Sequence, residues 1–132
     1  MEKILPTSGQ LERNLSQGIQ RLYRQELEHS PQKVTCQLFS NKLAIVIEDA
    51  LTAIEKTLAS SENDFSTVRQ LNTVINQAIK PKLKALVETT LAVEVQDILF
   101  DSTFETNQTG AIMTLKQLPV VRNPQSIPKY KS

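Results

Sequence analysis

The stretch that most constrains this fold is residues 31–58, in which two short alternating segments run directly into a helix. In the second segment, Leu43, Ile45 and Ile47 point to one side of an extended chain, and the residues between them point to the other. Residues 40–41 are Ser-Asn, which suits a two-residue turn because asparagine tolerates a positive φ. The stretch predicts a β-hairpin that needs a helix packed on its apolar face.

The helix after this hairpin is predicted from the start signal that it carries. Thr52 and Glu55 have the Thr-x-x-Glu spacing, in which each side chain accepts a hydrogen bond from the other residue's backbone N–H. Ile54 and Leu58 fall on one apolar stripe, and Lys56 falls outside it. We therefore expect a short helix that starts with a capping box.

A longer helix is predicted before the hairpin. It begins at a cap on Ser8 and ends near residues 28–30, because Pro31 disfavours a helical conformation in the residue before it. Gly18 inside the helix indicates a close approach by a neighbouring element. The apolar face consists of Leu11, Leu15, Ile19, Leu22 and Leu27, with Tyr23 at its edge.

A third helix is predicted after the polar residues 60–64, with Asp64 as its cap. Pro81 lies inside its apolar pattern, and we expect the proline to kink the helix or to divide it near Ile79. The apolar positions are Phe65, Val68, Leu71, Ile75, Ala78, Ile79, Leu83 and Leu86.

A second hairpin is predicted toward the C-terminus. A strand that begins near Ala92 is joined to a strand at 111–115 by the turn-rich residues 104–110. The alternation at 93–95 loses its phase at 97–100, where one extra residue would form a β-bulge.

The elements follow the order α-β-β-α-α-β-β, and short links between strands favour antiparallel pairing. We predict a two-layer α+β fold: a four-stranded, mainly antiparallel sheet of two hairpins with helices on one face. Residues 9–118 are predicted as this single domain and residues 1–8 as a flexible leader. Residues 119–132 contain three prolines and no periodicity, and are predicted as a disordered basic tail.

Charge and composition argue against several classes of function. The chain of 132 residues carries a net charge of +1, which does not indicate nucleic acid as the main partner. No run of about 18 apolar residues occurs, so we expect any membrane connection to go through a partner protein. A single cysteine and an N-terminus without a signal-peptide core indicate a cytoplasmic protein.

The single cysteine and the single histidine are expected to have structural roles. Cys36 lies within the apolar alternation of the first strand, so we interpret it as a core residue rather than a reactive thiol. His29 lies at a helix end, where an imidazole can reach free carbonyls, and this role is preferred over catalysis. No ligand-pair spacing indicates a zinc site.

No other pattern indicates catalysis. Glu48 and Asp49 are neighbours in an extended strand and face opposite sides, so they form a poor acid–base pair. Asp97 and Asp101 would bind a cation only if brought to Glu48, and we interpret them as solvated strand ends. With only three glycines, the chain has no phosphate-binding loop. We predict a protein that is not an enzyme and holds no cofactor or metal.

Two regions are candidates for contact with a partner: the start of the short helix and the tail. For the helix start, the alternative is that its residues only cap, pack and meet solvent. For the tail, which carries a charge of +3, the alternative is a solubilising segment. The candidate interaction residues are Thr52, Glu55, Lys56, Arg122, Lys129 and Lys131.

Several of these motifs, in this order, also carry a family resemblance. They are the helix end His29-Ser30-Pro31, the hairpin VTCQLFSNKLAIVIEDAL, the phrase at 51–58, Lys80-Pro81-Lys82-Leu83 and the closing hairpin. Over about residues 10–118 the chain resembles the bacterial MpsC-like family, a component of a sodium-translocating, membrane-potential-generating system that was formerly a domain of unknown function. Ala53 stands where members typically have proline, and Ser30 where they have glycine, so the chain resembles a divergent member.

The resemblance implies a cytosolic accessory protein linked to ion or inorganic-carbon transport through membrane subunits. Our first hypothesis is a non-enzymatic regulatory module that binds a protein partner, such as a transport subunit. The alternative is a small-molecule or ion sensor with a pocket between the kinked helix and the sheet near Pro81. An enzyme is a third hypothesis, and apolar surface left on one sheet face would also allow a homodimer.

Overall fold

The computed structural model describes residues 4–60 and 65–130. Its elements, in chain order, are α1 (Ser8–Leu27), β1 (Lys33–Phe39), β2 (Lys42–Glu48), α2 (Ala53–Ser60), α3 (Phe65–Leu91), β3 (Val95–Thr103), β4 (Gln108–Leu115) and the short 3-10 helix η1 (Pro124–Ser126). The predicted order α-β-β-α-α-β-β is confirmed.

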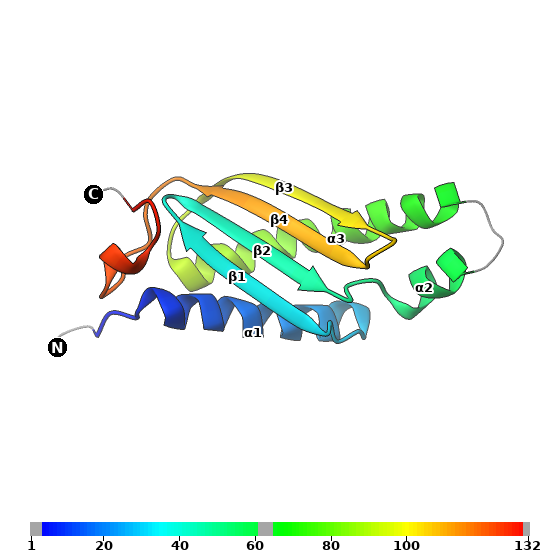
Figure 1. Cartoon of the computed structure of the whole chain (residues 1–132), viewed down its shortest axis with the longest axis horizontal. Helices are drawn as coiled ribbons and strands as arrows, with labels where there is room; N and C mark the ends of the chain where they lie inside the picture. The colour runs from blue at the N-terminus through cyan, green and yellow to red at the C-terminus, as the bar shows by residue number, and fades with distance from the viewer. Residues whose placement is uncertain (1–3, 61–64, 131–132) are drawn as a thin grey trace.

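The four strands form one antiparallel sheet in the spatial order β1-β2-β4-β3. Each hairpin supplies two neighbouring strands, and the hairpins meet where β2 pairs with β4. The helices α1 and α3 run along one face of the sheet, which lies in front of them in Figure 1. The predicted two-layer α+β fold is confirmed.

The core fills the space between the sheet and the helices. The alternation predicted for β2 is confirmed, since Leu43, Ile45 and Ile47 are buried while Val46 between them is 41% exposed. Burying an aliphatic side chain of this size contributes about 2 kcal/mol. The largest buried apolar side chains are Leu15, Ile19, Leu38, Leu43, Ile45, Ile47, Ile79, Leu83, Met113 and Leu115.

The first helix starts one residue earlier than predicted. Thr7 is the N-cap in place of Ser8, because Thr7 and Gln10 form a reciprocal capping box. Gly18 lies where α1 meets α3, and a Cβ there would come within 3.0 Å of Leu86. The close approach predicted at this glycine is therefore present.

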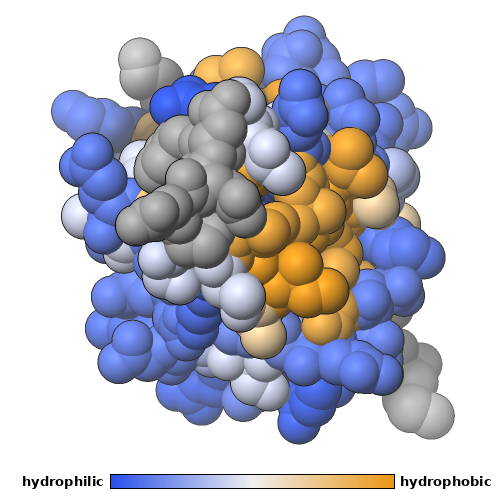
Figure 2. Space-filling model, turned by 90° about the vertical axis from the view of Figure 1, so that its right-hand side faces the viewer, coloured by the Kyte–Doolittle hydropathy of each residue, from blue (hydrophilic) through white to orange (hydrophobic). Residues whose placement is uncertain are grey.

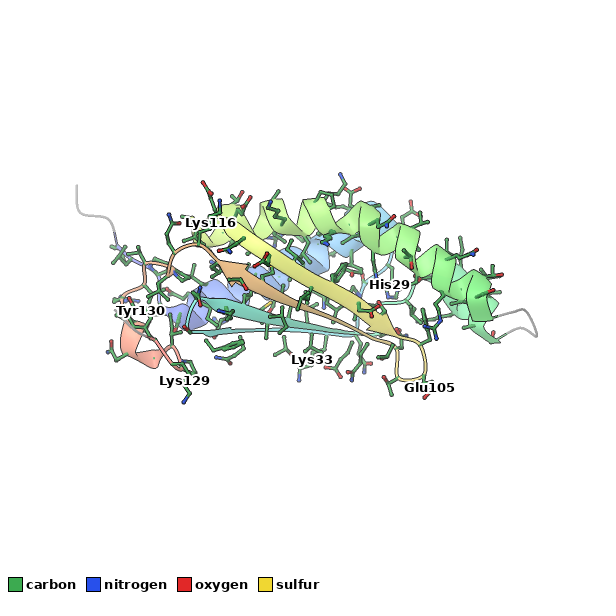
Figure 3. All side chains as sticks on the ribbon, turned by 90° about the horizontal axis from the view of Figure 1, so that it is seen from above. His29, Lys33, Glu105, Lys116, Lys129 and Tyr130 are labelled. Atoms are coloured by element: carbon green, nitrogen blue, oxygen red, sulfur yellow. The ribbon has the colours of Figure 1, made fainter. Side chains whose placement is uncertain are left out.

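The third helix is continuous through Pro81 over its 27 residues, so the predicted division near Ile79 is not present. Figure 3 shows that α3 curves along its length. Since proline has no N–H, the carbonyl of Gln77 loses its intrahelical donor. The buried side chains of Ile79 before the proline and Leu83 after it hold the helix on the core, so it stays continuous. The predicted cap at Asp64 lies outside the described residues.

Both hairpins differ from their predictions in local detail. The turn between β1 and β2 has its positive φ at Ser40 rather than at Asn41. In the second hairpin, β3 begins at Val95, and the register shift lies between Val95 and Asp97, slightly earlier than predicted. A β-bulge there restores the alternation that the sequence loses.

The C-terminal segment differs from the predicted disordered tail. Val121 and Ile127 are buried at 6% and 2% exposure, and the N–H of Ser40 donates to the carbonyl of Pro128. Asn123 also accepts a hydrogen bond from the N–H of Ser8. These apolar anchors hold the described part of the segment against the fold, because burying them offsets the entropy of ordering it.

Candidate functional site

The start of α2 forms the capping box that the sequence predicts. One carboxylate oxygen of Glu55 accepts hydrogen bonds from the N–H and the hydroxyl of Thr52, at 2.9 and 3.0 Å. In return, the N–H of Glu55 donates to the Thr52 hydroxyl. The side chain of Glu55 is only 1% exposed, so it holds the helix from inside rather than facing a partner.

A chain of hydrogen bonds continues from Glu55 into the interior. Asn72 of α3 donates to the second carboxylate oxygen of Glu55 at 2.7 Å, and Asn76 donates to Asn72. Asn76 also donates to the hydroxyl of Ser102, which bonds to the hydroxyl of Thr109. The chain satisfies polar groups that burial would otherwise make costly, and it ties α2 to the end of the sheet.

Asp49 joins three elements at the same end. Its carboxylate accepts a bond from Lys56 of α2 at 2.7 Å and another from Asn107 of the β3–β4 turn at 2.8 Å. The Lys56 ammonium beside it holds the pKa of Asp49 below its ordinary value. The Nε2–H of His29 donates to the backbone carbonyl of Asp49. His29 therefore does reach a carbonyl, but one outside its own helix.

The predicted interaction residues do not come together in one surface. Thr52, Glu55 and Lys56 lie at the α2 end of the molecule, and the C-terminal segment with Arg122 and Lys129 lies at the opposite end (Figures 1 and 3). Arg122 and Lys129 are exposed, and Lys131 lies outside the described residues. Partner contact at these positions other than Glu55 stays a prediction.

The remaining candidates from the sequence are a metal site, the Cys36 thiol and a membrane-spanning helix. Within residues 4–60 and 65–130, no three histidine, cysteine or acidic side chains come together as a metal site. Burial raises the pKa of the Cys36 thiol to about 11, as expected of a core cysteine. No helix in the described ranges is long and apolar enough to span a bilayer.

Among residues 4–60 and 65–130, the helices lie on one face of the sheet and none lies on the other, which we call the open face. It carries the residues that alternate with the core positions. Strand register places Ala44, Ile112 and Leu99 in one row across β2, β4 and β3. Leu99 is 70% exposed and Ile112 is 40% exposed. Apolar side chains lined up on a solvent-facing sheet make this face a candidate docking surface.

Next to this row the open face has a hollow above Gly110. The absent side chain leaves a depression of about 320 Å³ bordered by Val46 and Asp101. Gly110 has no positive φ, and a Cβ built there would meet only the carbonyl of Ile45 at 3.7 Å. The backbone therefore does not require glycine here, and the hollow is the feature that glycine provides.

A groove lies between α3 and the outer edge of β3, and we call it the α3–β3 groove. Its part beside Pro81 has a volume of about 410 Å³, in the place where the sequence suggests a pocket. Two lysines of α3, Lys80 and Lys84, line one wall, and Asp97 lines the other. A neighbouring part of the groove runs along Asn72, Asn76, Phe100 and Asp101.

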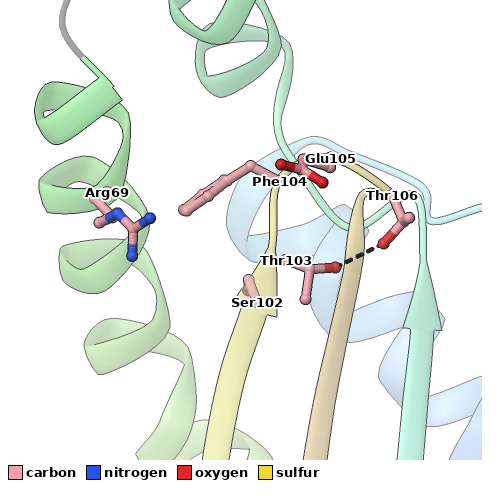
Figure 4. A pocket seen from close by; sticks show the side chains of 6 residues that line it. All are labelled: Arg69, Ser102, Thr103, Phe104, Glu105 and Thr106. Atoms are coloured by element: carbon pink, nitrogen blue, oxygen red, sulfur yellow. Dashed lines mark hydrogen bonds between the residues drawn. The ribbon is translucent and has the colours of Figure 1, made fainter.

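A further hollow lies at the β3–β4 turn. Figure 4 shows Arg69 of α3 directed at the ring of Phe104, and its guanidinium lies 5.8 Å from the ring centroid. The hydroxyls of Thr103 and Thr106 are hydrogen-bonded at 2.8 Å. These contacts hold the turn against α3. The described residues that line this hollow do not bring an acid, a base and a nucleophile together.

Apolar side chains also gather at the α2 end of the molecule (Figure 2). The large apolar residues of α2 and α3 that are exposed there are Ile54 at 67% and Val74 at 62%.

The described residues thus define a small two-layer α+β protein whose sheet is covered on one face only. Residues 7–117 match the family model described as the Na+-translocating membrane potential-generating system (MpsC). Since the match covers most of the chain, the protein belongs to this family, as the motifs of the sequence suggest. No match was found among curated proteins or among solved structures.

The sequence gives only part of the open face. Alternation in β2 assigns Ala44 and Val46 to the side opposite the core, which is the signal for apolar surface left over there. Leu99 is not singled out because the bulge disturbs the alternation of β3. Ile112 is not singled out because its exposure depends on which strands pair with β4.

Proposed function

We infer that this protein is a non-enzymatic accessory module of the sodium-translocating system of its family, and that it binds a protein subunit of that system through the open face. The observation that carries the proposal is the apolar row of Ala44, Ile112 and Leu99 on a sheet face without a covering helix. The family description supplies the membrane system. The module acts in the cytoplasm, where it meets the membrane subunit from one side.

Three features of the open face support a protein as the partner. The apolar row is buried only when a large surface covers it, and a small ligand would leave most of the row exposed to water. The hollow above Gly110 accepts one side chain from the partner, which is the usual form of an interface anchor. Asp97 and Asp101 beside the row supply charge at the rim.

The experiment is co-purification of the chain with the membrane subunit of the same system, using variants of the open face. Leu99→Ser removes an exposed apolar side chain, so the fold is retained while binding loses about 2 kcal/mol, or about 30-fold in affinity. Val120→Ser is the matched control, because Val120 is 68% exposed in the segment after β4 and is not part of the sheet. Equal loss in both variants would contradict the proposal.

A second variant tests the hollow without removing any contact. Gly110→Thr fills the depression, and strand propensity makes it neutral or slightly stabilising. We expect about tenfold weaker capture of the subunit with an unchanged melting temperature. Unchanged capture would show that the hollow receives no partner side chain.

The second candidate function is the sensing of a small anion, favoured by Lys80 and Lys84 in the α3–β3 groove. A bound anion would raise the melting temperature with its concentration, and Lys80→Gln would remove the rise. Lys129→Gln, in the C-terminal segment and outside the lining of the groove, is the control. A flat response over an anion panel would exclude this function.

A further inference from the structure

The two edges of the sheet are protected differently. At the outer edge of β1, the N–H of Leu38 donates to the carboxylate of Glu12 at 2.8 Å, and α1 runs beside the strand. At the outer edge of β3, carboxylates cover only the two ends of the strand. Glu88 accepts the N–H of Val95, and Asp101 accepts the N–H of Ser102, both at 2.8 Å. The middle of β3 is left as an edge.

Strand geometry identifies the groups at this edge. Successive residues of an antiparallel strand turn their N–H and C=O groups alternately toward and away from the paired strand. The N–H of Ser102 turns away from β4, so those of Phe100 and Ile98 also turn away. Neither amide has an acceptor within the described part of the chain. Ile98 and Phe100 therefore present two donors and two acceptors along the edge.

The α3–β3 groove lies directly beside these groups. Figure 3 shows α3 running alongside β3, above it in the picture. The helix wall holds Lys80 and Lys84, and Pro81 leaves the carbonyl of Gln77 without its intrahelical donor. A strand added to β3 would turn every second side chain into this groove and the others onto the open face.

The charges at the edge of β3 disfavour pairing with a second copy of the chain and favour a partner strand with basic side chains. On the open face, Asp97 and Asp101 flank Leu99, and all three are exposed. If a second copy paired antiparallel around Leu99, each Asp97 would lie opposite Asp101 of the other copy. Like charges directly opposite each other destabilise a strand pair, so self-pairing is disfavoured. Basic side chains at the same two positions would be favoured.

We propose that β3 is extended by a strand from the partner protein, which pairs with Ile98 and Phe100 and places basic side chains opposite Asp97 and Asp101. The residue between those two basic side chains is apolar, since it lies opposite Leu99. The pattern basic-x-apolar-x-basic fits in either strand direction because it is symmetric. This inference rests on the proposed function, because it names the segment of the partner that docks and the way it binds.

The test uses the full chain and a synthetic extended peptide with the central pattern Lys-Val-Val-Val-Lys as the probe. Binding is followed by fluorescence anisotropy, and amide hydrogen exchange is measured at Ile98 and Phe100. We expect exchange at both amides to slow by about tenfold or more on saturation, because a paired N–H is protected. No binding at millimolar peptide, or binding with unchanged exchange at both amides, would overturn the inference.

Two matched controls separate strand pairing from attraction of charge. Methylating the peptide nitrogens that face β3 should abolish binding, whereas methylating the alternate nitrogens should leave it. Asp97→Lys should weaken binding of the lysine peptide by about tenfold. The same substitution should strengthen binding of a peptide with glutamate in place of lysine. Glu105→Lys, which is exposed at the β3–β4 turn, should change neither. Equal effects in either pair of controls would overturn the inference.

Failure of strand addition can be told apart from failure of the proposed function. If the membrane subunit is captured and Leu99→Ser weakens it, while Ile98 and Phe100 show no protection, then the open face functions and strand addition is wrong. If the peptide protects both amides but no subunit is captured, the edge accepts a strand and the assigned partner is wrong.

Discussion

The two faces of this sheet are built from alternate residues of the same strands, and they differ in nearly every physical property. On the covered face, Ile45 and Met113 are 1% and 0% exposed, and they pack under the helices. On the open face, Val46 and Ile112 next to them are 41% and 40% exposed. One residue of displacement along the chain separates a core position from a surface position.

We expect the two faces to contribute to different properties, the covered face to folding stability and the open face to binding. The covered face already buries its apolar area, so its side chains stabilise the folded state. The open face keeps apolar area in water, and that area contributes free energy only when another molecule covers it. Substitutions on one face should therefore change unfolding, and substitutions on the other should change binding.

The largest effect is expected from truncation on the covered face. Ile45→Ala should lower the free energy of unfolding by about 3 kcal/mol, because it removes buried methyl groups and leaves a cavity. Val46→Ala, one residue away, should lower it by less than about 1 kcal/mol. Urea unfolding of both variants measures the difference. Similar losses in the two would contradict the assignment of the faces.

Thiol labelling compares the faces directly. Burial raises the pKa of Cys36 to about 11, so at pH 8 about 100-fold less reactive thiolate is present than for an ordinary cysteine. Gln37→Cys in a Cys36→Ser background puts the thiol on the open face. We expect it to react with a disulfide reagent about 100-fold faster than Cys36. Comparable rates would mean that the helices do not cover β1.

A substitution in the polar cluster around Glu55 should lower the free energy of unfolding by less than truncation of Ile45. Glu55→Ala removes the helix cap and leaves the amide of Asn72 without its acceptor, so we expect a loss of about 2 kcal/mol in unfolding free energy. Glu105→Ala is the exposed control and should change stability by about 0.5 kcal/mol at most. Thermal unfolding of the two variants checks this. A stable Glu55→Ala protein would show that the hydrogen-bond chain adds little.

The smallest effect is expected at the surface ion pair of Asp49 and Lys56. The pKa of Asp49 is lowered in the folded protein, so its contribution is present above its unfolded pKa of about 4 and is lost as pH falls through the lower folded value. At neutral pH, Asp49→Asn should lower the unfolding free energy by about 0.5 kcal/mol, since the pair is half-exposed. At about pH 2 the variant and the natural chain should be equal. A difference that grows at low pH would have the wrong sign.

Much of the fold can be predicted from local patterns. The alternation of Leu43, Ile45 and Ile47, the spacing of Thr52 and Glu55, and the helical periods all appear in the structure. These signals are reliable because each depends on neighbours within a few residues along the chain. The burial of Glu55 could not be predicted, because its partner Asn72 comes from another helix.

The order of the C-terminal segment also could not be predicted from local patterns. Three prolines and no periodicity predict disorder, yet Val121 and Ile127 find apolar surface at the end of the two layers. Whether a segment without regular structure is ordered depends on the surface that it meets. That surface is assembled from parts far apart in the sequence.

The sequence by itself determined the elements, their order, the two hairpins and the family. Only the tertiary structure decided that β2 and β4 lie side by side, that Ala44, Ile112 and Leu99 form one row, and that β3 is an edge strand of the described sheet. The physical reason is that alternation assigns a residue to a face, while the pairing of strands decides which residues share that face.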